Sequence, residues 1–92
     1  MRLSYPALLI SDPTRPGEYA VEVPDLPGCA TGGDRLDEAL LMAQDAVAGW
    51  VLSELEEGGA MPKASRPEDI HQYGSHQRVI IVSVDVDEHA TG

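Results

Sequence analysis

The chain has 92 residues and a formal net charge of −10, from 16 acidic and 6 basic side chains. The Lys and Arg side chains stand singly along the chain, so no basic patch is available to neutralise phosphates, and direct binding of DNA or RNA is not expected. The negative field favours basic partners and speeds encounter with them, although it serves solubility equally well.

The length and the cysteine content predict one small domain in a reducing compartment. Cys29 is the single cysteine, so an internal disulfide is excluded. The N-terminal residues do not resemble a signal peptide, and the apolar runs are too short to span a membrane, so we expect a soluble, cytoplasmic protein. The aromatic residues make up only 4% of the chain, and a small aliphatic core of this kind often gains stability from a homodimer or a higher oligomer.

Three short strands are predicted before the first helix. Residues 3–10 are apolar and β-compatible, and Pro6, which lacks an N–H, indicates an edge or an open side of that strand. Residues 18–23 alternate between apolar and polar side chains, which predicts a half-buried strand paired with the first as an antiparallel hairpin. A turn rich in proline and glycine follows over 24–28, and residues 29–31 form a short third strand.

Residues 34–57 are predicted to form a long amphipathic helix. Asp34 is the expected N-cap, and Gly58 with the following glycine ends the helix. Gly49 is the weak point of the helix, unless it allows close packing opposite Trp50. The apolar stripe consists of residues at helical spacing: Leu36, Ala39, Leu40, Ala43, Val47, Trp50, Val51 and Leu55.

After the long helix we expect a loop, a short helix over 67–73 and a last strand over 79–86. Both faces of that strand are apolar, so it is either central in the sheet or covered by another subunit. The order β-β-β-α-(short α)-β predicts the α+β class, with a small antiparallel sheet and its helices packed on one face. Residues 1–87 are assigned to the domain and residues 88–92 to a polar C-terminal tail.

No residues are assigned to catalysis, to a cofactor or to a metal. The three histidines match no metal-binding spacing and are expected in surface loops. Acidic residues near the strand ends form a weak candidate for a divalent-cation site: Glu22, Asp12, Asp25, Asp85 and Asp87. Cys29 has no partner histidine in a nucleophile motif, so a buried structural thiol is expected.

The sequence resembles the N-terminal domain of the HicB antitoxin family. The run Val-Pro-Asp-Leu-Pro-Gly-Cys at 23–29 and the Gly-Asp before the helix are the most specific part of the pattern. The similarity continues through Ala43, Ala46, Trp50, Glu57 and residues 61–65 and covers about two thirds of the chain. The resemblance implies a partial RNase H-like fold that binds HicA, a small basic RNA-cleaving toxin, and masks its active site.

The resemblance implies a non-enzymatic antitoxin that sequesters a HicA-like toxin. The net charge of −10 agrees independently with a basic partner, and no cofactor is expected. Many members carry a C-terminal DNA-binding domain, and because few residues follow residue 86, we expect this chain to lack it. Residues in the turn and at the acidic end of the helix are predicted to meet the partner: Asp25, Leu26, Glu54, Glu56 and Glu57. Two alternatives stay open at this point, a residual metal-dependent nuclease-like enzyme and an orphan structural module.

Overall fold

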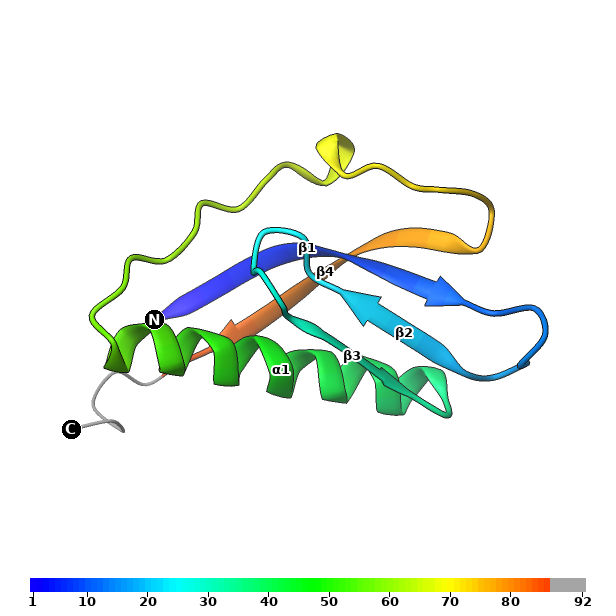
Figure 1. Cartoon of the computed structure of the whole chain (residues 1–92), viewed down its shortest axis with the longest axis horizontal. Coiled ribbons are helices and arrows are strands. Elements are labelled where there is room, and N and C mark those ends of the chain that lie inside the picture. Colours follow the sequence, from blue (N-terminus) through cyan, green and yellow to red (C-terminus); the bar gives the residue numbers. More distant parts are fainter. Residues whose placement is uncertain (87–92) are drawn as a thin grey trace.

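The fold is a four-stranded antiparallel sheet with one long helix, and the computed structural model describes residues 1–86 (Figure 1). In chain order the elements are β1 (Arg2–Ser11), β2 (Tyr19–Glu22), β3 (Ala30–Gly33), α1 (Leu36–Glu56), η1 (Pro67–Asp69) and β4 (Gln77–Asp85). The predicted α+β class and order of elements are confirmed. The short helix expected over 67–73 is a single 3-10 turn, and the predicted tail and its boundary lie outside the described residues.

The strand order β3-β2-β1-β4 places β1 in the middle of the sheet. The hairpin of β1 and β2 is antiparallel as predicted, and its ladder runs from Leu8 opposite Glu22 to Ser11 opposite Tyr19. Between the strands, Asp12 accepts hydrogen bonds from the backbone and side chain of Thr14. These turn contacts reverse the chain at the end of β1.

Pro6 occupies a position where its missing N–H costs no ladder hydrogen bond. The β1–β2 ladder begins only at Leu8, so β4 alone pairs with β1 at Pro6. Met1 and Val86 exchange two backbone hydrogen bonds of 2.8 and 2.7 Å. Because backbone groups alternate in direction along an antiparallel pair, the nitrogen of Pro6 points away from β4. The predicted open side of the strand is therefore confirmed.

The core lies between the sheet and α1. Every fourth residue of the helix is buried there, Ala39, Ala43, Val47 and Val51, as the predicted stripe requires. Leu36 and Leu40, at the N-terminal end of that stripe, are exposed instead. Above the sheet in the view of Figure 1, the segment after the helix runs back on the side opposite α1.

The helix starts one residue later than predicted and without a side-chain cap. Arg35, not Asp34, is the N-cap residue, and no side chain hydrogen-bonds there. Asp34 uses its backbone N–H to donate to the Glu38 carboxylate at 3.3 Å. The N-cap prediction was therefore wrong, because the ladder of β3 extends to Gly33 and leaves Asp34 in the connection.

The C-terminal end of α1 follows the prediction. Gly58 has a positive φ of 73°, which a residue without a side chain adopts without strain. The Gly59 N–H donates to the Glu54 carbonyl at 2.8 Å, the long-range bond of a Schellman motif. Among residues 1–86, no helix combines the length and the apolarity needed to cross a membrane.

β4 is an edge strand, and this corrects one of the two interpretations of its sequence. β4 pairs with β1 from Arg2 opposite Asp85 to Ile10 opposite Gln77, and it has no second neighbour in the described part of the chain. A central position in the sheet of one copy was therefore wrong. β1 and β4 are far apart in the sequence, and they pair because α1 and the segment after it return the chain to β1. The residues of β4 alone therefore do not predict its neighbour in the sheet.

Candidate functional site

An acidic groove lies between the start of β3 and one side of α1. It encloses about 380 Å³. One wall comes from the end of the turn and the first residue of β3, Gly28, Cys29 and Ala30. The other wall is the C-terminal half of the helix: Asp45, Ala46, Gly49, Trp50, Ser53, Glu54 and Glu57.

The charge of the groove is uniformly negative. Its charged side chains are the carboxylates of Asp45, Glu54 and Glu57, and no Lys or Arg lines it. The ion pairs found within residues 1–86 join arginines to carboxylates elsewhere, at Glu18, Asp37 and Asp69. The groove therefore presents carboxylates that are not neutralised by a side chain of the described part of the molecule.

Trp50 is the aromatic residue that lines the acidic groove. Its indole Nε1–H donates to the Pro27 carbonyl at 3.0 Å, which holds the ring against the turn. The indole remains partly exposed to the groove. An indole face beside carboxylates suits a Lys or Arg side chain, since the ring attracts the cation and the carboxylates accept its hydrogen bonds.

Small residues keep the groove open. Gly49 is exposed, and a Cβ added to it would meet no atom within 4 Å. The idea that Gly49 allows close packing opposite Trp50 is therefore wrong, since space and not a packed neighbour lies beside it. Gly28, with a φ of 79°, lies on the opposite wall, and its positive φ completes the turn before β3.

The structure divides the predicted partner-binding residues into two groups. Glu54 and Glu57 line the acidic groove, whereas Glu56 lies on the same helical turn outside its lining. Leu26 is 0% exposed and packs in the core, so its side chain offers no surface to a partner. Asp25 is half-buried and engaged in internal hydrogen bonds.

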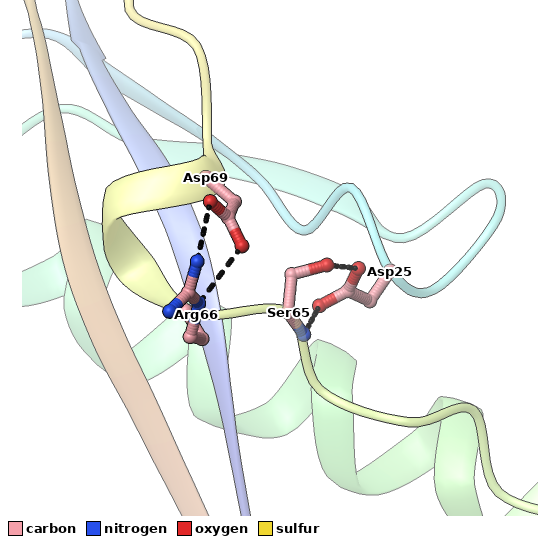
Figure 2. A network of polar contacts seen from close by, with 4 residues as sticks. All are labelled: Asp25, Ser65, Arg66 and Asp69. Atoms are coloured by element: carbon pink, nitrogen blue, oxygen red, sulfur yellow. Dashed lines mark hydrogen bonds and ion pairs between the residues drawn. The ribbon is translucent and has the colours of Figure 1, made fainter.

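Asp25 fastens the turn to the segment that follows the helix (Figure 2). Its two carboxylate oxygens accept hydrogen bonds from Ser65, one from the backbone N–H at 2.8 Å and one from the hydroxyl at 2.7 Å. Next to it, Arg66 forms an exposed ion pair with Asp69 over 3.1 Å. The Asp25 carboxylate therefore has a structural role that accounts for its place in the turn.

Sequence reasoning missed several residues of the groove, and a signal for them was present. Asp45, Gly49, Ser53 and Glu57 follow one another at intervals of four, which places them on one face of a helix. All four residues are exposed, and their face is turned away from the buried stripe. What the sequence did not indicate is that residues 28–30 would form the opposite wall, since this contact joins segments distant in the chain.

Cys29 lies at the edge of the groove as a buried thiol, as predicted. Its side chain is 7% exposed, and burial raises its pKa above the usual 9.0. Tyr5 behaves similarly, since burial and then the charge of Asp25 raise its pKa above 10.0. The Tyr5 hydroxyl donates to the Pro62 carbonyl at 2.7 Å and so needs its proton.

We expect the free energy of unfolding to fall as the pH rises above about 9. In the unfolded chain Cys29 and Tyr5 ionise near their ordinary pKa values of 9.0 and 10.0, whereas the folded chain keeps both protons to higher pH. The unfolded state therefore loses protons first, and stability decreases through this range. Urea unfolding at pH 7.5, 9 and 10.5 measures the effect, and Cys29→Ser should remove its lower part. A stability that stays constant up to pH 10.5 would contradict this prediction.

The weak metal candidates do not come together in the structure. Within residues 1–86, no group of three or more His, Cys, Asp or Glu side chains is arranged to hold a metal ion. His71 and His76 are exposed, and Asp85 lies exposed at the end of β4. Asp87 and His89 lie outside the described residues.

The protein is therefore a small α+β domain whose candidate site is an acidic groove lined by a tryptophan. The chain belongs to the HicB-like antitoxin family of bacterial toxin-antitoxin systems, whose family model matches residues 5–91. The resemblance stated from the sequence is thereby confirmed.

Two solved structures and one curated relative are similar to this chain. The fold is similar to a chain of a toxin-antitoxin complex from Streptococcus pneumoniae, with a TM-score of 0.79 and 30% identity, covering 97% of this chain and 73% of that one. It is also similar to the Burkholderia pseudomallei antitoxin HicB, with a TM-score of 0.70 and 25% identity, covering 94% and 64%. An uncharacterised 14.9 kDa protein of Haemophilus phage HP1 is 38% identical over 69 residues, and the match spans 75% of this chain but only about half, 52%, of that relative.

Proposed function

We propose that this chain is an antitoxin domain that sequesters a small basic toxin of the HicA type by binding it in the acidic groove. The observation that carries the proposal is that Asp45, Glu54 and Glu57 line one groove together with the partly exposed Trp50, with no basic side chain among them. Family membership supports an antitoxin role, and the net charge of −10 supports a basic partner. The proposed action is non-enzymatic, since a bound toxin is masked rather than altered.

The groove offers a basic side chain two kinds of favourable contact. A Lys or Arg over the Trp50 ring gains roughly 0.5–2 kcal/mol from the cation–π attraction, more as water is excluded. Hydrogen bonds to charged groups such as the Asp45 or Glu57 carboxylate contribute about 1.5–3 kcal/mol each. The remaining negative charge of the chain speeds encounter with a basic protein at low salt.

Charge reversal at Glu57 tests the groove. Glu57→Lys is expected to raise the dissociation rate of a HicA-type toxin by roughly tenfold or more, because it removes one acceptor and places a repelling cation in the groove. Glu56→Lys is the matched control, since it changes the net charge equally on the same helical turn but lies outside the groove. Both lysines are near the helix C-terminus, where the helix dipole favours positive charge, so neither should unfold the chain.

Surface plasmon resonance with the toxin encoded beside this chain measures the association and dissociation rates, at low and at high salt. Both variants should slow association similarly, since association depends on net charge, whereas only Glu57→Lys should speed dissociation. Equal dissociation rates for the two variants would remove the groove from the binding site. If the native chain binds no basic toxin and does not relieve its growth arrest on co-expression, the antitoxin function itself is wrong.

A further inference from the structure

The turn over residues 23–29 is a closed unit that supplies part of one wall of the acidic groove. The Val23 N–H donates to the Cys29 carbonyl at 3.0 Å and joins the two ends of the turn. Within it, the Leu26 N–H donates to the Val23 carbonyl at 3.0 Å, and the Cys29 N–H donates to the Leu26 carbonyl at 2.9 Å. Hydrogen bonds between residues three apart are those of β-turns, so they fix the shape of this segment. Its orientation against α1 depends on contacts with other parts of the chain.

Three contacts hold the turn against the rest of the fold. The Leu26 side chain is 0% exposed and anchors the turn in the core. The Trp50 indole Nε1–H, from α1, donates to the Pro27 carbonyl at 3.0 Å. Ser65, in the segment after the helix, donates to both carboxylate oxygens of Asp25, at 2.8 Å from its backbone and at 2.7 Å from its hydroxyl (Figure 2). Because the turn can tilt about one buried side chain, the contacts before and after Leu26 determine its orientation.

Ser65 is itself held in place by the sheet. The Tyr5 hydroxyl donates to the Pro62 carbonyl at 2.7 Å, and Tyr5 lies in β1 with its side chain 1% exposed. Only two residues separate Pro62 from Ser65, so the bond from Tyr5 restricts where Ser65 lies. The hydrogen bonds between Asp25 and Ser65 therefore connect the turn to the sheet, whereas the bond from Trp50 connects it to α1.

We propose that Asp25 and Ser65 are a positioning pair for the acidic groove. Their hydrogen bonds fix the orientation of the turn, which sets the place of the Pro27 carbonyl, the direction of the Trp50 ring and the distance between the two walls. Asp25 acts on a basic partner through this geometry and not through its charge, since its half-buried carboxylate is engaged by Ser65 at both oxygens. The inference rests on the proposed function, because it concerns the groove in which that function is placed.

Four substitutions separate geometry from charge. Asp25→Ala removes both hydrogen bonds and the charge, and Ser65→Ala removes one bond without changing the charge. Asp25→Asn removes the charge alone, because its amide oxygen can accept from the Ser65 N–H while its amide nitrogen donates to the Ser65 hydroxyl. Asp69→Ala is the matched control, since it removes one carboxylate from the neighbouring exposed pair with Arg66 (Figure 2). Circular dichroism verifies that each variant is folded.

Quenching of tryptophan fluorescence by acrylamide measures the effect on the groove without any partner. Trp50 is the one tryptophan of the sequence, so the signal reports on this ring. Asp25→Ala and Ser65→Ala should raise the quenching constant, because the Pro27 carbonyl no longer holds the indole in a fixed place. Asp25→Asn and Asp69→Ala should leave the quenching constant at the native value. If Asp25→Ala does not fold, Ser65→Ala makes the same test.

Surface plasmon resonance with the basic toxin measures the effect on binding. Asp25→Ala and Ser65→Ala should raise the dissociation rate roughly fivefold or more, which corresponds to about one hydrogen bond lost in the groove. Asp25→Asn should dissociate at the native rate. Its association should slow only as much as that of Asp69→Ala, since both lose one negative charge.

Two results would overturn the positioning role. If Asp25→Asn raises the dissociation rate as much as Asp25→Ala, the carboxylate meets the partner through its charge. If Asp25→Ala and Ser65→Ala change neither the quenching of Trp50 nor the dissociation rate, the pair does not position the groove. The proposed function fails by different results, which are a native chain that binds no basic toxin or equal dissociation rates for Glu57→Lys and Glu56→Lys.

Discussion

Truncation of Leu26 to alanine is expected to lower the free energy of unfolding by about 2–5 kcal/mol. The Leu26 side chain is 0% exposed and belongs to the core formed by the sheet and α1. Its backbone is held by the turn, where its N–H donates to the Val23 carbonyl at 3.0 Å and its carbonyl accepts from Cys29 at 2.9 Å. Because the turn holds this residue on both sides, neighbouring groups have little freedom to fill the cavity.

Leu41→Ala is the matched control for Leu26→Ala. The same side-chain atoms are removed from a helix position that is 63% exposed, so stability should change by about 0.5 kcal/mol or less. Urea unfolding of the two variants measures the difference. An equal loss of unfolding free energy in both variants would contradict the placement of Leu26 in the core.

Two glycine-to-alanine substitutions are expected to change the melting temperature in opposite directions. A Cβ on Gly33 would lie 2.7 Å from the Ala39 backbone nitrogen, where β3 meets the first turns of α1. Since helix backbone cannot yield as a flexible side chain does, Gly33→Ala should cost about 1–3 kcal/mol. Gly49→Ala meets open space and should raise the stability of the helix by up to about 1 kcal/mol.

Thermal unfolding followed by circular dichroism measures both glycine variants. For a domain of this size, about 1 kcal/mol corresponds to roughly 4–8 °C in the melting temperature, so the two values should lie well apart. A rise in the melting temperature for Gly33→Ala would contradict the close approach of β3 and α1. No rise for Gly49→Ala would contradict the open space beside Gly49.

The regular elements could be predicted from the sequence because their signals are local. Alternating side chains over 18–23 and turn residues after Ser11 indicate the first hairpin, which the structure confirms. The four-residue spacing of small apolar residues predicts the buried face of α1, and Gly58 predicts its end. The N-cap prediction at Asp34 was wrong because the position of the cap depends on where the preceding strand ends. Since β3 continues to Gly33, the helix begins one residue later than the sequence suggested.

The candidate site was predicted only in part, because it combines local and distant residues. The negative charge near Glu54 and Glu57 is visible along one helix and was noted. Leu26 and Asp25 are neighbours in the same turn, and the sequence predicted both as partner-binding residues. In the structure Leu26 packs in the core and Asp25 accepts hydrogen bonds from Ser65. The direction in which each side chain of a turn points is set by the elements packed around it.

The α+β class, the hairpin, the long helix and the family follow from neighbouring residues, since periodicity, turn chemistry and a continuous motif are local properties. The edge position of β4 and the groove between residues 28–30 and the side of α1 that carries Asp45, Trp50 and Glu57 arise only in the folded chain. These features depend on how α1 crosses the sheet and returns the chain to β1. Such contacts join segments far apart in sequence, and packing of the whole core selects them.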